Sequence, residues 1–298
     1  MNILITGSNG FLGKVLLKTL QETKNVFKLN RSNSDYNINL ECDQILFNDH
    51  FELVIHAAGK AHTIPKSHKE KILLYESNVK GTQNLLNALL KIHKPKMFVF
   101  ISSVSVYGII DGYSINENSP LLANDPYGQS KIHCEKIIQD WCNNNNVICT
   151  ILRLPLVVGA NPPGNLGNMI RAIQKGYYFN ISAGVSKKSM VLASDIAKFI
   201  FNAAEVGGIY NLTDGYHPNF NELSHCIARQ IGVKFVFNMP KYFANVLALI
   251  GDRLGTKFPI NSDRLAKITS TLTFDDTKAR KSFGWNPTPV LKGFKINE

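Results

Sequence analysis

A tyrosine and a lysine four residues apart are the first residues in this chain whose types and spacing suggest chemistry. Tyr127 and Lys131 stand at the start of a helical pattern, and this spacing places both side chains on one helix face. A nearby ammonium group favours the phenolate, so we expect Lys131 to lower the pKa of Tyr127. Such a phenol can pass a proton to or from a carbinol oxygen. We expect Ser103, at the carboxyl end of a predicted strand, to hydrogen-bond the same oxygen, because ligands of parallel α/β sheets bind there.

A glycine-rich turn near residue 10 could hold a dinucleotide beside these residues. An apolar run over residues 1–6 leads into Gly7, Gly10 and Gly13, and an apolar helical pattern follows at once. Gly7 can take the tight turn, Gly10 lets the backbone approach a pyrophosphate, and Gly13 lets the helix pack closely on the strand. The helix N-terminus adds free N–H groups and the positive end of a dipole. The strand-to-helix context favours dinucleotide binding over an ordinary turn.

Strands and helices that alternate along the chain must position both groups. Apolar runs predict strands over 1–6, 26–29, 53–56, 97–101, 147–154 and 208–212, and helical patterns cover 79–92 and 131–142. This alternation predicts an α/β fold, a Rossmann-type doubly wound parallel sheet with a smaller C-terminal substrate lobe. We expect the dinucleotide-binding domain over 1–160, joined by 185–215, and the substrate lobe mainly over 161–298. The apolar, amphipathic stretch 243–254 is expected to be a core-facing helix of that lobe rather than a membrane-surface helix.

Composition excludes several other classes of protein. The net charge is +11, but the lysines are spread along the chain, which favours anionic small molecules over nucleic acid. The five cysteines are scattered and the eight histidines lack metal spacing, so we expect no metal site and a reducing compartment. Apolar runs of about 18 residues and a signal-peptide pattern are both missing, so we expect no membrane insertion and a cytoplasmic protein.

Further motifs accompany the glycine turn and the tyrosine–lysine pair in a familiar order. Together they resemble the extended short-chain dehydrogenases/reductases, within the NAD-dependent epimerase/dehydratase family and its branch of nucleotide-sugar 4-epimerases and 4-keto reductases. The resemblance covers nearly the whole chain. It rests on His56-Ala-Ala-Gly59, Asn78-Val-Lys-Gly81, Ser102-Ser-Val-Ser-Val-Tyr-Gly108, Arg153-Leu-Pro155, Asn165-Leu166, Phe274-Asp-Asp-Thr-Lys-Ala-Arg280 and Phe283-Gly-Trp285.

The resemblance implies particular cofactor contacts. The loop that begins at His56 would lie against the pyrophosphate and ribose, Asn78 would support the active-site helix, and Pro155 would lie beside the nicotinamide. The cofactor-binding residues expected on this basis are Gly7, Asn9, Gly10, Phe11, Leu12, Gly13, Asn30, Arg31, Asn39, Leu40, His56, Ala57, Ala58, Gly59, Asn78, Tyr127, Lys131 and Pro155.

The resemblance also implies a UDP-sugar substrate and a homodimer. Asn165 and Leu166 resemble the segment that holds the substrate diphosphate, and a lysine at position 188 can neutralise a diphosphate as a point charge. The substrate-binding residues expected on this basis are Lys60, Ser103, Ser105, Asn165, Leu166 and Lys188.

The segment at the end of the second predicted strand bears on cofactor choice. It has no acid to bind a ribose 2′-hydroxyl, whereas Arg31 could bind a 2′-phosphate through charge-assisted hydrogen bonds, so we predict NADP(H) over NAD(H). By the same resemblance, dehydratases of the family have a Thr-Asp-Glu arrangement where this chain has Ser103-Val104-Ser105. The carboxyl groups that would supply the acid and the base for water elimination are therefore missing, and we predict no dehydratase activity.

These observations favour one reaction within the family. We predict reduction of the C4 ketone of a UDP-4-keto-6-deoxy-HexNAc in bacterial surface-polysaccharide biosynthesis, with Ser103, Tyr127 and Lys131 as catalytic residues. Two alternatives stay open: a UDP-sugar 4-epimerase that retains NAD tightly, and a non-enzymatic NADP-binding sensor.

Overall fold

A seven-stranded parallel sheet forms the centre of the molecule. The structure is a computed structural model that describes residues 1–60, 67–254 and 260–297. Its main sheet has the order β11-β7-β5-β4-β1-β2-β3, so the chain winds outward from β1 in both directions and leaves a topological switch point between β1 and β4. The predicted doubly wound fold is confirmed. The strands are β1 (Asn2–Thr6), β2 (Asn25–Asn30), β3 (Tyr36–Asn37), β4 (Leu53–His56), β5 (Met97–Ser103), β7 (Ile148–Leu154) and β11 (Gly208–Asn211).

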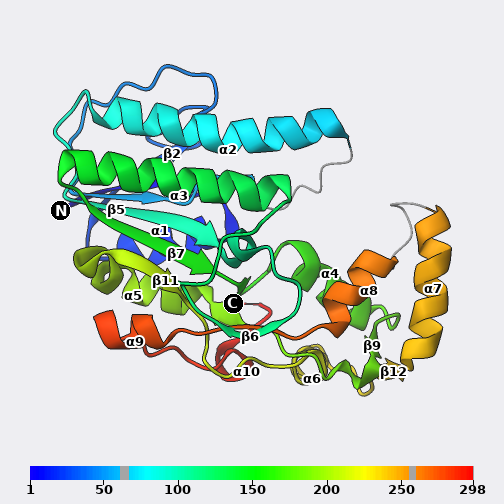
Figure 1. Ribbon diagram of the computed structural model, residues 1–298. Helices are drawn as coiled ribbons and strands as arrows, with labels where there is room; N and C mark the ends of the chain where they lie inside the picture. Colours follow the sequence, from blue (N-terminus) through cyan, green and yellow to red (C-terminus); the bar gives the residue numbers. More distant parts are fainter. Residues whose placement is uncertain (61–66, 255–259, 298) are drawn as a thin grey trace.

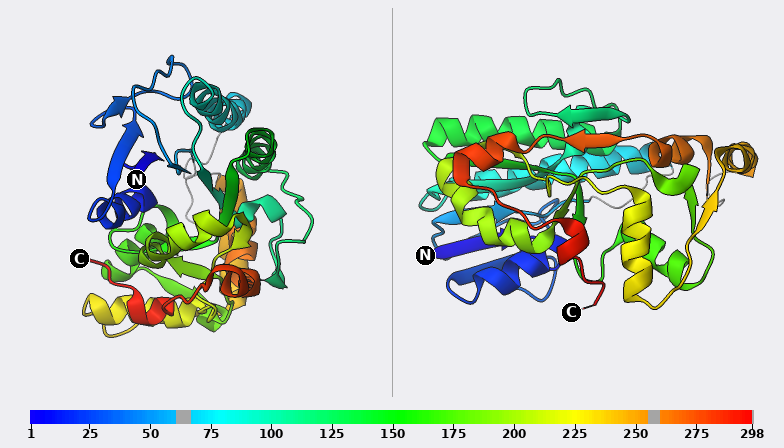
Figure 2. Two further views of the ribbon diagram at one scale, coloured as in Figure 1. Left: turned by 90° about the vertical axis from the view of Figure 1, so that its left-hand side faces the viewer. Right: turned by 90° about the horizontal axis from the view of Figure 1, so that it is seen from below.

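Helices cover both faces of this sheet (Figures 1 and 2). Alternate residues of β1 serve the two faces, because Ile3 and Ile5 belong to one apolar cluster and Leu4 to the other. On the first face lie α1 (Phe11–Leu20), α5 (Ala193–Val206) and α9 (Thr277–Phe283), and on the second lie α2 (His68–Leu89) and α3 (Pro126–Asn145).

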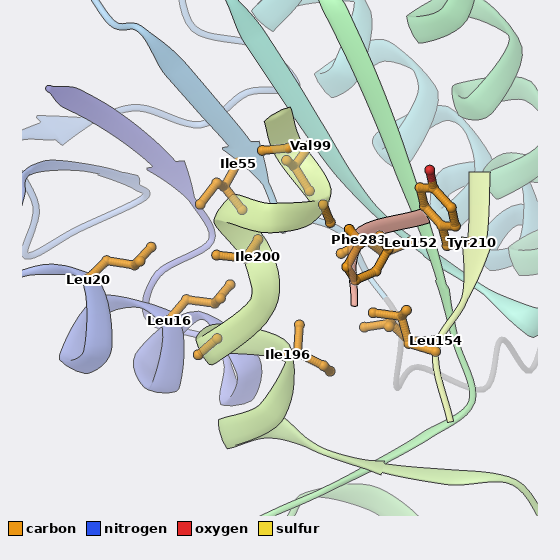
Figure 3. Packing of buried hydrophobic residues seen from close by; sticks show 14 of the residues in the cluster. Leu16, Leu20, Ile55, Val99, Leu152, Leu154, Ile196, Ile200, Tyr210 and Phe283 are labelled. Atoms are coloured by element: carbon orange, nitrogen blue, oxygen red, sulfur yellow. The ribbon is translucent and has the colours of Figure 1, made fainter. Parts of the chain in front are cut away.

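The first cluster includes residues from both ends of the chain (Figure 3). Phe283 packs against Tyr210 of β11 with ring centroids 4.9 Å apart, and Trp285 packs against Phe199 of α5 at 5.2 Å. The Trp285 indole N–H donates to the carbonyl of Thr213 at 3.0 Å. The segment around α9 therefore completes the core of the sheet that β1 begins.

A smaller layer of helices and two-stranded sheets lies beyond the carboxyl ends of the main strands (Figure 1). Its own apolar cluster includes Leu166, Ile173, Leu223, Ile227 and Val290. Its helices are α4 (Gly164–Gln174), α6 (Phe220–Gln230), α7 (Lys241–Leu254), α8 (Ser262–Thr269) and α10 (Val290–Gly293). The paired strands are β6 (Gly112–Ile115) with β13 (Leu272–Phe274), β8 (Leu156–Val158) with β10 (Met190–Leu192), and β9 (Phe179–Ile181) with β12 (Phe237–Met239). The short helices η1 (Val104–Tyr107) and η2 (Ser182–Gly184) complete the elements.

Helix α7 packs against the smaller layer, as expected for residues 243–254, but not through its large apolar side chains. Its buried residues are Ala244, Ala248 and Gly251, whereas Phe243 and Leu249 are exposed. The amphipathic pattern was present, but the face that packs against the protein is the one with small side chains.

The described residues show neither a membrane-spanning helix nor a metal-binding cluster. Within the described ranges, none of the helices has the length and apolar character that crossing a membrane requires. The same residues contain no cluster of three potential metal ligands.

Candidate active site

The glycine turn lies between β1 and α1 and is held by steric contact. Gly7 has φ +75°, and a Cβ there would lie 2.7 Å from the Ala58 nitrogen. A Cβ on Gly13 would lie 2.2 Å from the Gly7 carbonyl oxygen, so helix and turn can approach only because both residues lack side chains. Gly10 is the N-cap of α1 and supplies no side-chain cap. The first N–H groups of α1 are therefore available to an anion.

Asn30, at the end of β2, fixes the outer part of this turn. Its side-chain Oδ1 accepts from the Asn9 backbone N–H at 3.2 Å, and its side-chain Nδ2 donates to the Ser8 hydroxyl at 2.8 Å. The Asn9 side chain donates to the Ser32 carbonyl at 3.0 Å. The turn and the end of β2 thus form one hydrogen-bonded rim.

A cavity of about 440 Å³ opens at the switch point beside the turn. Its volume falls within the range typical of small-molecule and cofactor sites. The predicted cofactor residues in its wall are Gly7, Asn9, Gly10, Asn30, Arg31, Asn39, Leu40, His56, Ala57, Ala58, Gly59 and Asn78.

Two predicted cofactor residues direct their side chains elsewhere. The Phe11 ring lies against Gly159, where a Cβ would approach the ring to 3.2 Å. Leu12 packs against the apolar cluster of the sheet. Because both side chains pack within the protein, they can offer a dinucleotide only their backbone at the start of α1.

His56 lines the cavity as expected, but its ring is held by the protein's own hydroxyl groups. Its ring is buried, and its two nitrogens are hydrogen-bonded to the hydroxyls of Thr6 at 2.7 Å and Thr82 at 2.9 Å. Burial, with a smaller contribution from the charge of Lys131, lowers the pKa of His56 to about 3. The ring is therefore a neutral core group, and only the backbone of this residue can serve the cavity.

Glu41 is a wall residue that the sequence reasoning missed. It accepts a hydrogen bond from Ser77, and its carboxylate lies 3.3 Å from the Arg31 guanidinium and 3.1 Å from the Lys60 ammonium. Burial raises the pKa of Glu41, but these partners outweigh it and hold the pKa below its ordinary value. An acid is thus present beside Arg31, brought there by the loop after β3, although β2 itself ends without one.

Lys60, expected to bind substrate, is paired with the same carboxylate. Its ammonium group points to Glu41 in the wall of the cavity. Its backbone N–H donates to Asn78 at 2.8 Å. Asn78 in turn donates to Ser130 at 3.0 Å and so links this loop to α3.

The three predicted catalytic residues meet at the carboxyl end of β5. Asp125 caps α3 by accepting from the N–H groups of Tyr127 and Gly128, which fixes the first turn of the helix. Ser103 ends β5 and donates to the Ser105 hydroxyl at 3.1 Å, and its hydroxyl exerts a lowering effect on the pKa of Tyr127. Ser103 and Tyr127 can therefore bind one oxygen together.

Lys131 does not lower the Tyr127 pKa as expected. Its ammonium group donates to the Ile101 carbonyl at 2.9 Å and lies 6.0 Å from the centroid of the Tyr127 ring. Burial raises the pKa of Tyr127 to about 12, against a lowering contribution from Ser103. Burial also lowers the pKa of Lys131. In the protein alone, desolvation dominates the pKa of both groups.

A buried ion pair behind the catalytic residues was also missed. Arg153 of β7 and Glu135 of α3 form a fork, with a shortest N–O distance of 2.7 Å, and both side chains are almost fully buried. Glu135 also accepts from Ser102 at 2.5 Å, and Arg153 donates to Tyr107 at 3.1 Å. Residues 127, 131 and 135 share one helix face, a spacing that could have pointed to Glu135.

The remaining predicted substrate residues lie in the smaller layer or at its border. Asn165 is exposed in the first turn of α4, whose N-cap has no side-chain hydrogen bond, whereas the Leu166 side chain is buried in the apolar cluster. Pro155 separates β7 from β8. Lys188 donates to Ser270 at 3.2 Å, and burial lowers its pKa to about 8. Leu166 can therefore contribute only backbone to a ligand.

Comparison with known sequences points to sugar epimerases. Residues 3–213 match the model of the NAD dependent epimerase/dehydratase family. The chain is 28% identical, over 98% of its length and 92% of the relative's, to N-acetyl-alpha-D-glucosaminyl-diphospho-ditrans,octacis-undecaprenol 4-epimerase of Escherichia coli O157:H7. It is 26% identical, over 99% and 93%, to UDP-glucose 4-epimerase of Vibrio cholerae.

The fold agrees with this match. UDP-glucose 4-epimerase of Thermotoga maritima, solved with UDP-glucose, superposes with a TM-score of 0.76 at 22% identity, over 97% of this chain and 94% of that one. The resemblance predicted from the motifs is confirmed, and the protein is an NAD(P)-dependent enzyme of the short-chain dehydrogenase/reductase class. The chain belongs to the NAD dependent epimerase/dehydratase family.

Proposed function

We propose that this protein is a 4-epimerase of a diphosphate-linked hexose or N-acetylhexosamine and that it retains its dinucleotide between turnovers. The observation that carries the proposal is the placement of Ser103 at the carboxyl end of β5 and of Tyr127 and Lys131 in the first turns of α3, with the Lys131 ammonium at the cavity wall beside Gly59. Both relatives described above are 4-epimerases, and this supports the epimerase over the C4 reductase.

The cavity fits an NAD(P) cofactor. The uncapped first turn of α1 suits a pyrophosphate, and the close approach of Gly7 to Ala58 leaves backbone rather than side chains at the rim. A Cβ on Gly59 would lie 3.5 Å from the Lys131 ammonium, so this lysine reaches the wall of the cavity and could bind a ribose hydroxyl. The chemistry that the bound cofactor supplies is reversible hydride transfer at C4.

The protein's own residues would then manage the proton and the oxygen. The phenolate of Tyr127 removes the proton of the 4-hydroxyl as C4 is oxidised, and the phenol returns it when C4 is reduced from the opposite side. Ser103 holds the same oxygen by a hydrogen bond. Because burial raises the Tyr127 pKa in the protein alone, a positive charge near the phenol, such as an oxidised nicotinamide would supply, would favour the phenolate.

Glu41 supports NAD(H) as the working cofactor, against the NADP(H) prediction from Arg31. The guanidinium of Arg31 is already paired with Glu41, and a 2′-phosphate would have to approach this carboxylate. Repulsion between the negative phosphate and the negative carboxylate would disfavour NADP(H) binding unless one of the two charges is neutralised. The Arg31 position remains the one observation that favours an NADPH-dependent reductase as the second candidate.

Two measurements separate the candidates. First, any nucleotide released by denaturing the purified protein is identified; retained NAD agrees with the epimerase, whereas an empty or exchangeable site that prefers NADPH contradicts it. Second, UDP-GlcNAc and UDP-glucose are incubated with the protein without added cofactor. We expect the C4 epimer to form without net change in NADH absorbance, and we expect none with Tyr127→Phe. Stoichiometric NADPH oxidation with a UDP-4-keto-6-deoxy-HexNAc would instead establish the reductase.

A further inference from the structure

Helix α7 presents its large apolar side chains to solvent. Tyr242 is 73% exposed, Phe243 60%, Leu249 63% and Leu254 62%. The residues that α7 buries are small, Ala244, Ala248 and Gly251. A helix that packed only within its own domain would show the reverse arrangement, so this face needs a partner outside the described structure.

The strands that precede α7 carry two further exposed aromatic side chains. Phe237 of β12 is 59% exposed, and its ring lies 6.2 Å from that of the exposed Phe179 in β9. Pro240 leads directly from β12 into α7. We name this set the outer apolar surface: Phe179, Phe237, Tyr242, Phe243, Val246, Leu249, Ile250 and Leu254.

The outer apolar surface lies at one end of the molecule. Helix α7 is beyond α8 at the edge toward which β5 and β7 point, and a perpendicular view also places it at the periphery (Figures 1 and 2). This is the end that carries the smaller layer, not the end where the strands begin. Any extended surface that binds α7 would therefore lie at the carboxyl ends of the strands, where ligands of such sheets bind.

Charge distinguishes among the occupants of such a face. The segment 234–254 contains three basic residues, Lys234, Lys241 and Arg253, all exposed, and one acidic residue, Asp252. The whole chain carries +11. A second copy would bring the same positive surface against itself, whereas an anionic lipid surface complements it. Aromatic and aliphatic residues flanked by Lys and Arg are also the composition of helices that lie in a membrane interface.

We propose that the outer apolar surface binds peripherally to an anionic phospholipid membrane, with α7 lying in the plane of the headgroup–acyl boundary. Phe243, Leu249 and their neighbours enter the boundary, and Lys241 and Arg253 extend to the headgroups. The binding needs no substrate, so it stands apart from the proposed epimerase activity. If the sugar carrier is a membrane lipid, the same docking brings that sugar diphosphate to the site.

Vesicle sedimentation tests this proposal. The full chain is mixed with vesicles of phosphatidylcholine that contain phosphatidylglycerol, and with vesicles of phosphatidylcholine alone. We expect binding to the anionic vesicles that weakens with salt. The double variant Phe243→Ser/Leu249→Ser should bind about tenfold or more weakly, because two apolar anchors are lost. The variant Lys241→Glu should also bind more weakly, and it keeps the test open if the double variant does not fold.

The matched control is Leu46→Ser/Leu122→Ser, which removes two leucines of similar exposure, 61% and 65%, outside the outer apolar surface. We expect this variant to bind as the parent does. The proposal is overturned if the parent stays in the supernatant, if the double variant and the control behave alike, or if equilibrium sedimentation shows a dimer that only the α7 variants dissociate. Since no nucleotide sugar is present, a failed epimerase assay leaves these outcomes unchanged.

Discussion

The central sheet and helix α7 of the smaller layer differ in which apolar side chains they bury. The sheet buries large ones, whereas α7 buries small ones and exposes large ones. In the sheet, Ile3, Ile55 and Leu152 are fully buried, and the charges of Arg153 and Glu135 are paired in a fork. On α7 the small residues are inside and Leu249 is outside. The first region is closed by helices on both faces, whereas α7 rests on one layer alone.

This difference indicates that the apolar residues of the sheet stabilise the fold, whereas those of α7 are available for association. A fully exposed leucine or phenylalanine leaves about 1.5–3 kcal/mol of transfer free energy unrealised. Several such residues on one helix therefore contribute little to folding, and their free energy remains available for association. In the sheet, the same residue types hold the catalytic groups in place. The comparison can be tested in each region.

The largest effect is expected on kcat, from a substitution of Tyr127 at the carboxyl edge of the sheet. Tyr127→Phe removes the proton donor and acceptor and should lower kcat about 100- to 10,000-fold. Cofactor affinity, measured by fluorescence titration, should change little, since the aromatic ring remains. Tyr113→Phe, which changes a tyrosine that is 74% exposed, is the matched control and should keep normal turnover. Near-normal kcat in Tyr127→Phe would remove this residue from the mechanism.

The comparison itself is measured by one substitution made in both regions. Leu16→Ala empties a position that is 0% exposed and should cost about 2–5 kcal/mol of unfolding free energy. Leu249→Ala, at 63% exposure, should change it by about 0.5 kcal/mol or less. Urea denaturation of both variants provides the values. Equal losses would mean that α7 is covered by another copy of the chain in solution.

A smaller effect is expected at Lys188, a polar and partly buried residue of the smaller layer. Burial lowers its pKa to about 8, so the ammonium form that attracts a diphosphate is present below that pH and lost above it. The affinity for UDP should therefore fall roughly tenfold between about pH 7 and pH 9. Titration calorimetry at both values measures this. Lys188→Met should bind weakly at each pH, and Lys91→Met, an exposed control, should follow the parent; a pH response retained in Lys188→Met would assign it to another group.

The sheet and the glycine turn could be predicted because their signals are local. Strands covered on both faces give continuous apolar runs, and the turn needs glycine at fixed positions. Helix boundaries were less accurate: α2 begins at His68, capped by Ser67, well before the predicted residue 79. Its first turn is polar, and the apolar run Ile72–Leu74 that follows lacks the helical spacing on which the prediction depended.

The features that the sequence did not reveal share one physical cause. Periodicity says which residues share a face but not what covers that face, so it did not show that α7 packs through its small side chains. Sequence order likewise did not reveal that the loop after β3 carries Glu41 to Arg31, or that the His56 ring turns inward to two threonines. The domain division at residue 160, the homodimer and the site roles remain predictions.

The packing of Phe283 and Trp285 against β11 and α5 has a consequence for how the protein is made. The cluster that contains Ile3 and Leu16 is completed only by residues 279–285. Because a ribosome releases the N-terminus first, the first face of the sheet stays partly uncovered until almost the whole chain has emerged. We expect the nascent chain to need protection from aggregation through most of its synthesis, and fragments that end before α9 to behave as chaperone clients rather than as folded domains.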